Sequence, residues 1–391
     1  MIFSKKEWGN KSNQKNIFWA YCRTALLFLV FAGTLWAATP QQARADHTVT
    51  IAIVGPMVGD SFSVGLQYNV GVTAAVQTLP GRLLLGKELK IKTYDDKCST
   101  PVAEKVALDL VTSPPAVVIG HSCSMATLAA APVYARHKIL QITPASTNSQ
   151  ITELGIGTIF RMIGRDDLQG EIAAERIAAL HAGKKIGVFY FLGNYSEGLA
   201  RNAIKTLEKK GIKPVYTGIG IVSASSYADN IQDMIDAGVE VLYLTGGGLD
   251  SGIFMRQASQ MDAPFRVIGS DTLVSKVFIE TAESAGEGIP FTFPPEAAKM
   301  STSKQAAAAI KELGQEPAGY TLLAYAATET WIEGVRRANS FDADLVATAI
   351  RQAPIETILG QISFDTQGDI HTNYPAFSWY IWKEGKRVPL D

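Results

Sequence analysis

Two loops rich in hydroxyl groups could hold an anion. The loop Gly120–Ser124 follows a short apolar run, and the loop Ile142–Asn148 follows the next such run along the chain. Each loop offers hydroxyls and free backbone N–H groups at the expected start of a helix, where the helix dipole favours negative charge. The alternative is that Ser124 and Thr147 only cap these helices. Because the two loops follow successive runs, we favour a site for an anion such as a carboxylate.

The same kinds of segment approach two catalytic patterns without completing either. Gly120–Ser124 comes near the G-x-S-x-G turn of serine hydrolases, but position 124 is serine, and no partner acid and histidine can be placed. Thr245–Gly248 is glycine-rich after a predicted strand, yet it does not complete the G-x-G-x-x-G loop of dinucleotide sites. Its glycines fit a close approach of the backbone to a ligand, or a tight turn. We therefore expect a binding protein without a cofactor and not an enzyme.

The N-terminal segment has the features of an export signal. A leader with four lysines and one arginine precedes the apolar run Ala25–Ala38, and Ala43-Arg44-Ala45 supplies the small-x-small pattern of a signal peptidase site. We predict a cleaved signal peptide at residues 1–45, a mature chain that starts at Asp46, and a periplasmic location. The alternative is an uncleaved anchor over Ile17–Ala38, but its longest uncharged part is short of the roughly 20 residues that span a bilayer.

The cysteines favour a disulfide. One of the three lies in the predicted signal, so the mature chain keeps Cys98 and Cys123. An even pair in an oxidising compartment is typical of a disulfide. A metal site would combine the two thiols with His121 and with Asp95 or Asp96, but the paired C-x-x-C spacing of zinc sites is missing. We expect a disulfide and no metal.

The overall charge points to no polymeric partner. The 391 residues include 36 basic and 37 acidic side chains, so no net field attracts nucleic acid or anionic lipid. The hydrophobic share of 47% is enough for two compact domains with cores of their own. We therefore expect a small-molecule partner and no nucleic acid.

Alternating elements must position the loops. The first series predicts strands at Val49–Val54, Leu89–Tyr94, Ala116–Ile119 and Ile139–Ile142, with helices at Gln67–Gln77, Pro101–Leu110 and Met125–Arg136. The second predicts strands at Lys185–Phe191, Lys213–Thr217, Val239–Leu244 and Arg266–Ile268, with helices at Leu168–Leu180, Glu197–Lys209, Tyr227–Ile235 and Gly252–Met261. Helices from Ser303 to Arg351 and strands at Gln361–Phe364 and Ala376–Trp382 complete the chain. This alternation predicts an α/β protein with parallel sheets in two lobes, where loops that follow successive strands meet at one edge.

Four segments, taken in order, resemble a known family. They are Asp95-Asp96-Lys97-Cys98, Gly120–Ser124, Pro144–Asn148 and Tyr195–Arg201. As a set they resemble the periplasmic leucine/isoleucine/valine-binding proteins of ABC transporters, which have the type I periplasmic binding fold. The similarity extends from Val49 to the segment Trp379–Trp382.

The resemblance implies an architecture and a transport role. Two Rossmann-like lobes with parallel-type sheets are expected to be joined by three crossovers, near Arg165, Phe293 and Asp365. The N-terminal lobe would comprise residues 46–165 plus 294–365, and the C-terminal lobe residues 166–293 plus 366–391. The ligand would lie in the interlobe cleft, the lobes would close around it, and a membrane permease of an ABC transporter would receive it. The resemblance also implies a disulfide between Cys98 and Cys123.

The resemblance further implies a clamp for the backbone of an amino acid. The Ser124 hydroxyl and nearby backbone N–H groups would hold the α-carboxylate. The Ala145 carbonyl, the Thr147 hydroxyl and the Asp271 carboxylate would hold the α-ammonium. The family usually has glutamate where Asp271 stands, so a water is expected to bridge this shorter carboxylate to the ammonium. Tyr195 matches a tyrosine that the second lobe contributes to the cleft.

The expected side-chain pocket departs from the family pattern. It comprises Phe62, Val64, Ser122, Gly247 and Tyr320. Val64 stands where the family has a large aromatic residue and Gly247 where it has a tyrosine, whereas Ser122 and Tyr320 add hydroxyls at apolar positions. A larger or more polar pocket should bind leucine less well, because affinity there depends on excluding water from apolar surface. We therefore predict an amino acid or a close analogue, with specificity shifted from the aliphatic type.

Two alternatives stay open within this fold. The ligand could be an amide, urea or a small aromatic acid, and the receptor could serve a sensory protein. Asp271 distinguishes the ligand classes, because a carboxylate in the clamp calls for an ammonium group. The absence of a fused signalling segment favours transport over sensing.

Overall fold

The computed structural model describes residues 47–59, 61–297, 301–317 and 319–390. The predicted signal peptide, residues 1–45, and the predicted mature start at Asp46 lie outside these residues. Within the described ranges no helix is both long and apolar enough to cross a membrane. All the elements that follow belong to the compact unit Val49–Asp391, apart from the first residue of β1.

The first sheet has six strands in the order β2-β3-β1-β4-β5-β6. The strands are β1 (Thr48–Gly55), β2 (Leu83–Leu84), β3 (Lys87–Asp95), β4 (Val117–Gly120), β5 (Leu140–Thr143) and β6 (Ile159–Arg161). The neighbours β1 and β4, β4 and β5, and β5 and β6 pair in parallel, and β2 pairs with β3 in an antiparallel way. Buried central strands of this kind are typical of α/β proteins, which cover both faces of a sheet with helices.

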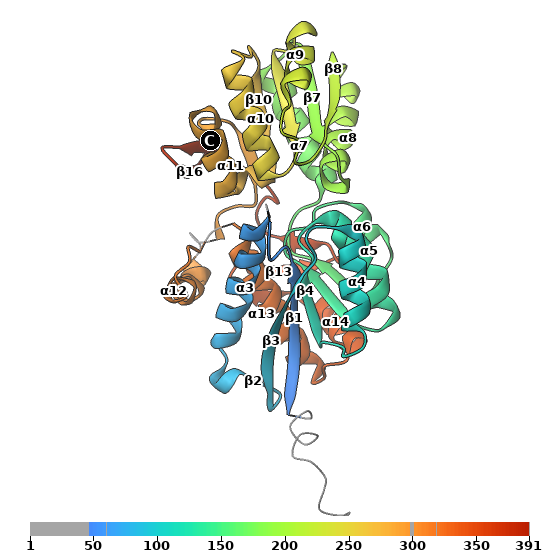
Figure 1. The fold of residues 1–391 in the computed structure, drawn as a ribbon. Coiled ribbons are helices and arrows are strands. Elements are labelled where there is room, and N and C mark those ends of the chain that lie inside the picture. Colours follow the sequence, from blue (N-terminus) through green and yellow to red (C-terminus); the bar gives the residue numbers. More distant parts are fainter. Residues whose placement is uncertain (1–46, 60, 298–300, 318, 391) are drawn as a thin grey trace, which may run out of the picture. The chain divides into compact units, whose positions relative to one another are not determined.

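Helices cover the two faces of this sheet (Figure 1). The surrounding helices are α3 (Phe62–Gln77), α4 (Thr100–Leu110), α5 (Ser124–Arg136), α6 (Gln150–Glu153), α12 (Lys304–Glu312), α13 (Tyr320–Ala338) and α14 (Ala343–Gln352). Ile51 and Ile53 of β1 lie in the core with α3 and α13, whereas Ala52 and Val54 lie in the core with α4 and α5. The period of two in a strand thus sorts adjacent β1 side chains into two helical layers.

The second sheet has seven strands in the order β16-β15-β11-β10-β9-β7-β8. Its parallel strands are β7 (Ile186–Phe191), β8 (Tyr216–Gly220), β9 (Val241–Thr245), β10 (Arg266–Gly269) and β11 (Phe291–Phe293), and the antiparallel strands β15 (Ser378–Lys383) and β16 (Lys386–Pro389) extend one edge. Its helices are α7 (Asp166–Leu180), α8 (Asn194–Lys209), α9 (Ala228–Asp236), α10 (Gly248–Gln260) and α11 (Lys276–Ala282), with the short helices η2 (Asp271–Val274) and η3 (Glu283–Gly286). Val188 packs with α7 and α8, and Phe189 packs in the core that contains Phe254 of α10.

A small antiparallel sheet completes the fold. It consists of β12 (Ile355–Thr357), β13 (Gly360–Phe364) and β14 (Ile370–Thr372), and the short helices η1 (Pro80–Arg82) and η5 (Ser301–Ser303) lie in connections. The chain leaves the first sheet after β6, leaves the second after β11, and returns to the second after β14. This α/β architecture with two mostly parallel sheets confirms the predicted fold class.

Candidate functional site

A cavity of about 490 Å³ lies where strands of both large sheets end. The first sheet contributes the segments that follow β1, β3, β4 and β5, and the second contributes those that follow β7, β8, β9 and β10. Tyr320, the first residue of α13, also lines it. Ligands in open α/β sheets bind outside the carboxyl ends of parallel strands, and this cavity has that position.

Most of the side chains predicted from the sequence line this cavity. They are Val64, Cys98, Ser122, Cys123, Ser124, Ala145, Tyr195, Gly247, Asp271 and Tyr320. Phe62 and Thr147 are not in the lining: Phe62 is 48% exposed, and Thr147 is buried beside the cavity. The roles of these residues toward a ligand remain predictions.

The helix start at Ser124 leaves room for an anion. The residue that caps α5 is Cys123, whose side chain accepts no hydrogen bond from the helix, although its carbonyl oxygen accepts from the backbone N of Ala126 at 3.0 Å. Ser124 is itself the first helical residue, and its Oγ accepts a hydrogen bond from the backbone N of Asn148 at 3.3 Å. The capping role weighed for Ser124 is therefore not what the structure shows. The helix α5 has 13 residues, and the N–H groups at its N-terminus that no side chain caps favour a carboxylate.

Hydroxyls from the loop after β5 hold the loop after β4 in place. Ser146 Oγ lies 3.1 Å from the His121 carbonyl oxygen and 3.0 Å from the Ser122 carbonyl oxygen. Thr143 Oγ1 donates to the His121 carbonyl at 2.7 Å, and Thr127 Oγ1 is 2.7 Å from Ser146 Oγ. These hydroxyls satisfy buried backbone groups, so they position Ser122 and Ser124 and do not face a ligand.

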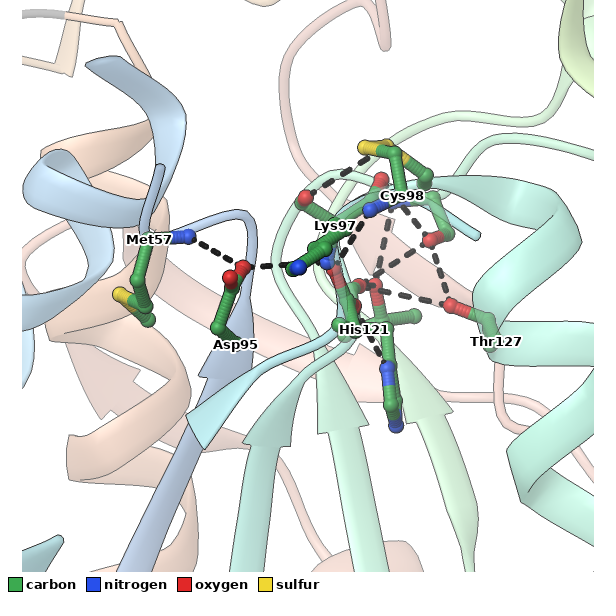
Figure 2. The surroundings of a disulfide bond; sticks show 11 residues. Met57, Asp95, Lys97, Cys98, His121 and Thr127 are labelled. Atoms are coloured by element: carbon green, nitrogen blue, oxygen red, sulfur yellow. Dashed lines mark hydrogen bonds and ion pairs between the residues drawn. A yellow bond between two sulfur atoms is a disulfide. The ribbon is translucent and has the colours of Figure 1, made fainter. Parts of the chain in front are cut away.

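The predicted disulfide joins Cys98 and Cys123, and the structure confirms it (Figure 2). It links the segment after β3 to the start of α5. Nearby, His121 Nδ1 lies 2.7 Å from Asp96 Oδ2, and His121 Nε2 lies 3.0 Å from the Tyr134 hydroxyl, with His121 and Asp96 fully buried. Because the thiols are in a disulfide, this histidine and aspartate act in packing and not as metal ligands. The described residues contain no cluster of His, Cys, Asp and Glu suited to a metal.

The carboxylate of Asp271 is the centre of a buried polar cluster. It accepts hydrogen bonds from the hydroxyls of Tyr195 and Tyr320 and from Gln169 Nε2, the last two at 3.0 and 3.1 Å. Burial raises the pKa of Asp271, and these hydrogen bonds offset part of that rise. Gln169 could not be predicted from the sequence, because no motif surrounds it and its partner Asp271 lies 102 residues further along the chain.

A second buried carboxylate, Asp166, lies close to this cluster. Asp166 begins α7, its backbone N donates to the Thr147 carbonyl at 2.9 Å, and its side chain is 1% exposed. Among the described residues, the carboxylate oxygens of Asp166 have no hydrogen bond of good geometry, and the Thr147 hydroxyl is their nearest polar neighbour of those that affect the pKa. Burial raises the pKa of Asp166 well above its ordinary value, the nearby Thr147 hydroxyl offsets part of that rise, and the charge of Asp271 adds to it. Asp166 does not line the cavity, but its carboxyl group near Asp271 adds to the preference of that end of the site for positive charge.

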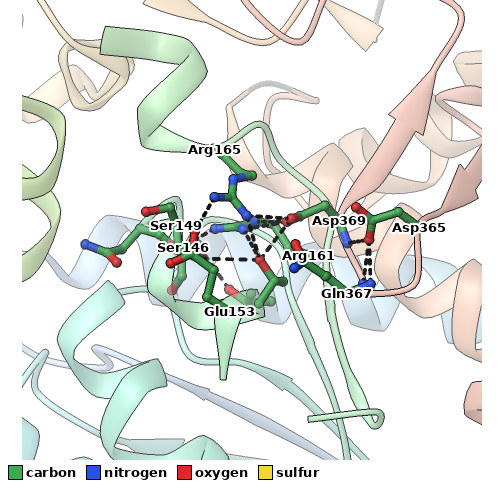
Figure 3. A network of polar contacts seen from close by, with 12 residues as sticks. Ser146, Ser149, Glu153, Arg161, Arg165, Asp365, Gln367 and Asp369 are labelled. Carbon is green, nitrogen blue, oxygen red and sulfur yellow. Dashed lines mark hydrogen bonds and ion pairs between the residues drawn. The ribbon is translucent and has the colours of Figure 1, made fainter. Parts of the chain in front are cut away.

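A buried ion pair joins two connections between the large sheets (Figure 3). Arg161 of β6 is fully buried, and its Nε donates to Asp369 Oδ1 at 2.8 Å. Arg161 Nη1 also donates to the Asn148 carbonyl at 2.7 Å, behind the loop after β5. Arg165 adds a bond from Nη1 to Asp369 Oδ2 at 3.1 Å and one from Nη2 to Glu153. The network ties β6 and the start of α7 to the segment before β14.

The chain has relatives of the same architecture. A model of the periplasmic binding protein family matches residues 48–384. The leucine-, isoleucine-, valine-, threonine- and alanine-binding protein of Pseudomonas aeruginosa is 31% identical over 361 residues, which cover 91% of this chain and 96% of that protein.

Solved structures agree with this match. A leucine binding protein from Thermotoga maritima superposes with a TM-score of 0.79 at 25% identity, and the match covers 88% of this chain and 98% of that one. A solute binding protein of an ABC transporter from Rhodopseudomonas palustris, solved with 3,4-dihydroxy benzoic acid, has a TM-score of 0.77 at 21% identity, covering 88% and 96%. These matches confirm the resemblance found in the sequence. The chain is a receptor and not an enzyme, and it belongs to the periplasmic binding protein family, the solute receptors of ABC transporters.

Proposed function

We propose that this protein is exported to the periplasm, binds an amino acid or a close analogue, and delivers it to the permease of an ABC transporter. The observation that carries the proposal is the opposed chemistry of the cavity. One side has the N-terminus of α5 at Ser124, and the other has the buried carboxylate of Asp271. A zwitterion, with a carboxylate for the Ser124 side and an ammonium for the Asp271 side, matches both.

The proposed roles follow this division. Ser124 and the first N–H groups of α5 bind the α-carboxylate, and the Ala145 carbonyl and Asp271 bind the α-ammonium. Thr147 does not line the cavity, and its carbonyl oxygen accepts a hydrogen bond from the backbone N of Asp166. We therefore propose that it positions the start of α7. Tyr195 orients Asp271 through its hydrogen bond.

The lobes proposed to close on the ligand are residues 46–165 plus 294–365 and residues 166–293 plus 366–391. Ligand that bridges both lobes would shift an open–closed equilibrium toward the closed state. The P. aeruginosa relative is named for five amino acids, which supports an amino-acid ligand. The R. palustris structure holds an aromatic acid, so that class serves as the alternative in the test.

The clamp can be tested with one substitution and two matched ligands. Asp271→Asn keeps the size of the side chain and removes its charge. Titration calorimetry should show at least a tenfold loss of affinity for the best amino acid, and little change for the corresponding acid that lacks the α-amine. The exposed Asp109→Asn is the control for loss of negative charge. Equal losses for both ligands would show that Asp271 supports the fold and does not contact an ammonium.

A further inference from the structure

A second acidic side chain reaches the cavity apart from the amino-acid clamp. Asp250 lies in the first turn of α10, is 6% exposed and lines the cavity. Its Oδ1 accepts hydrogen bonds from the backbone N of Ser223 at 2.7 Å and from the Tyr227 hydroxyl at 2.6 Å. Its Oδ2 accepts no hydrogen bond and forms no ion pair in the part of the chain that the structure describes. One oxygen therefore fixes the carboxylate, and the other is available.

The hydrogen bonds of Asp250 hold its carboxylate on the side of the sheet away from Asp271. Asp250 belongs to the segment after β9, the neighbour of β10, but its carboxylate bonds to Ser223 and Tyr227, which follow β8. Asp271 follows β10, and the strand order places β9 and β7 between β10 and β8. A ligand whose α-ammonium is near Asp271 would therefore meet Asp250 with its side chain.

Gly247 leaves the free oxygen of Asp250 open to the cavity. The nearest heavy atom to a Cβ placed on Gly247 would be Asp250 Oδ2, at 3.8 Å, with nothing else within 4 Å. Gly247 has an extended backbone with φ of −66°, so it is not glycine for conformational reasons. The missing side chain thus creates space directly in front of a carboxylate.

Apolar residues line the cavity on the side of the second sheet. They include Phe191, Leu192, Val222 and Val277. Such a surface suits an aliphatic stem, whereas a buried carboxylate at its end suits a positive charge. Together these features match a side chain with methylenes and a terminal cation.

We propose that Asp250 selects an ammonium or guanidinium group at the end of the ligand's side chain, so that the preferred ligands are basic amino acids. This inference rests on the proposed function, because the α-carbon groups must be held at the Ser124–Asp271 clamp. The competing partner for Asp250 within the chain is Lys97, the cation that lines the cavity from the segment after β3. Lys97 is exposed, whereas Asp250 is buried, so a desolvated ligand cation has the stronger interaction.

The test compares charged ligands with neutral ones of the same shape. Calorimetry on the protein purified after expression of the full chain would use arginine against citrulline and lysine against norleucine. The proposal predicts at least a tenfold preference for each cation, and Asp250→Asn should reduce that preference to threefold or less with norleucine affinity unchanged. Equal affinity for charged and neutral members in the unaltered protein would overturn it.

A second variant keeps the test decisive if Asp250→Asn disturbs the Ser223 loop. Gly247→Leu keeps Asp250 and fills the space in front of it, and it should weaken arginine and lysine while sparing alanine. Lys97→Met tests whether Asp250 pairs with Lys97 instead of with the ligand. If it does, Lys97→Met and Asp250→Asn will weaken charged and neutral ligands by the same factor, which would contradict the proposal. If no amino acid binds at all, the proposed function fails, whereas binding without preference for a cation defeats only this inference.

Discussion

The Tyr320 hydroxyl donates a hydrogen bond to Asp271 Oδ2 at 3.0 Å, and the other carboxylate oxygen accepts bonds from Tyr195 and Gln169. The bond joins the first residue of α13, which packs on α3, to the short helix after β10. It is the one described hydrogen bond to Oδ2, so it controls whether that oxygen is free for an ammonium.

Removing this hydroxyl should reveal the competition. Tyr320→Phe leaves Asp271 Oδ2 without a donor, which should lower the free energy of unfolding of the ligand-free protein by about 1.5–3 kcal/mol. A bound ammonium would replace the donor, so saturating amino acid should stabilise the variant more than the unaltered protein. Urea unfolding with and without ligand measures both effects. The same ligand-induced gain in the two proteins would show that the ammonium does not approach Oδ2.

A half-buried glutamate on α13 should make stability fall as pH rises. Burial raises the pKa of Glu329 from 4.5 to about 7, partly offset by the hydrogen bond from the Ile358 backbone N at 2.8 Å. Between these values the unfolded chain releases its proton before the folded one does, so the contribution present below pH 4.5 is lost by pH 7 and above. A shift of this size corresponds to at most about 3 kcal/mol.

Glu329→Gln should therefore raise the free energy of unfolding at pH 8 by on the order of 1–3 kcal/mol and leave it unchanged at pH 4.5. Thermal unfolding across that range measures the difference, and the exposed Glu312→Gln on α12 is the control. A gain of equal size at both pH values would mean that charge at position 329 is not the cause.

The Arg161–Asp369 pair should be costly to break. Asp369→Ala leaves a fully buried guanidinium without its carboxylate, which should lower the free energy of unfolding by about 3–5 kcal/mol. Asp167→Ala, which removes an exposed partner of Arg165, should cost less than about 1 kcal/mol. Chemical denaturation of both variants gives the comparison, and similar small losses would contradict the importance of the buried pair.

The disulfide should stabilise the folded chain. Replacing Cys98 and Cys123 with serine opens a link between residues 25 positions apart, which should lower the free energy of unfolding by about 3 kcal/mol. Urea unfolding with and without a reductant measures this. The unaltered protein should lose stability in reductant and the double variant should not; a double variant that responds to reductant would point to another cause.

The central strands could be predicted because their sequences are continuous apolar runs. Val49–Val54 and Ala116–Ile119 became β1 and β4 with small changes at their ends. The start of α3 at Phe62 was missed, since glycine and β-branched residues in its first turn have low helix propensity. The sheet of β12 to β14 was only partly foreseen, because strands of three residues give no clear period.

The candidate site could be predicted where its residues follow strands in recognisable segments. Ser122, Ser124 and Ala145 are of this kind, and all line the cavity. Asp166 and Asp250 were not predicted, because an acidic residue at the start of a helix is common and does not by itself indicate a binding site. Only the folded chain shows that Asp166 is buried beside Asp271 and that Asp250 faces the cavity.

The most direct test of the account is a ligand panel measured by thermal shift and confirmed by calorimetry. The protein purified after expression of the full chain would meet the twenty amino acids, simple amides, urea and small aromatic acids, each in large excess. A ligand at a hundred times its Kd stabilises by about 2.7 kcal/mol, which is easily observed. The account predicts that stabilisation is confined to α-amino acids and close analogues that carry an ammonium. Stabilisation only by compounds without an ammonium, such as a hydroxybenzoate, would contradict the assigned role of Asp271.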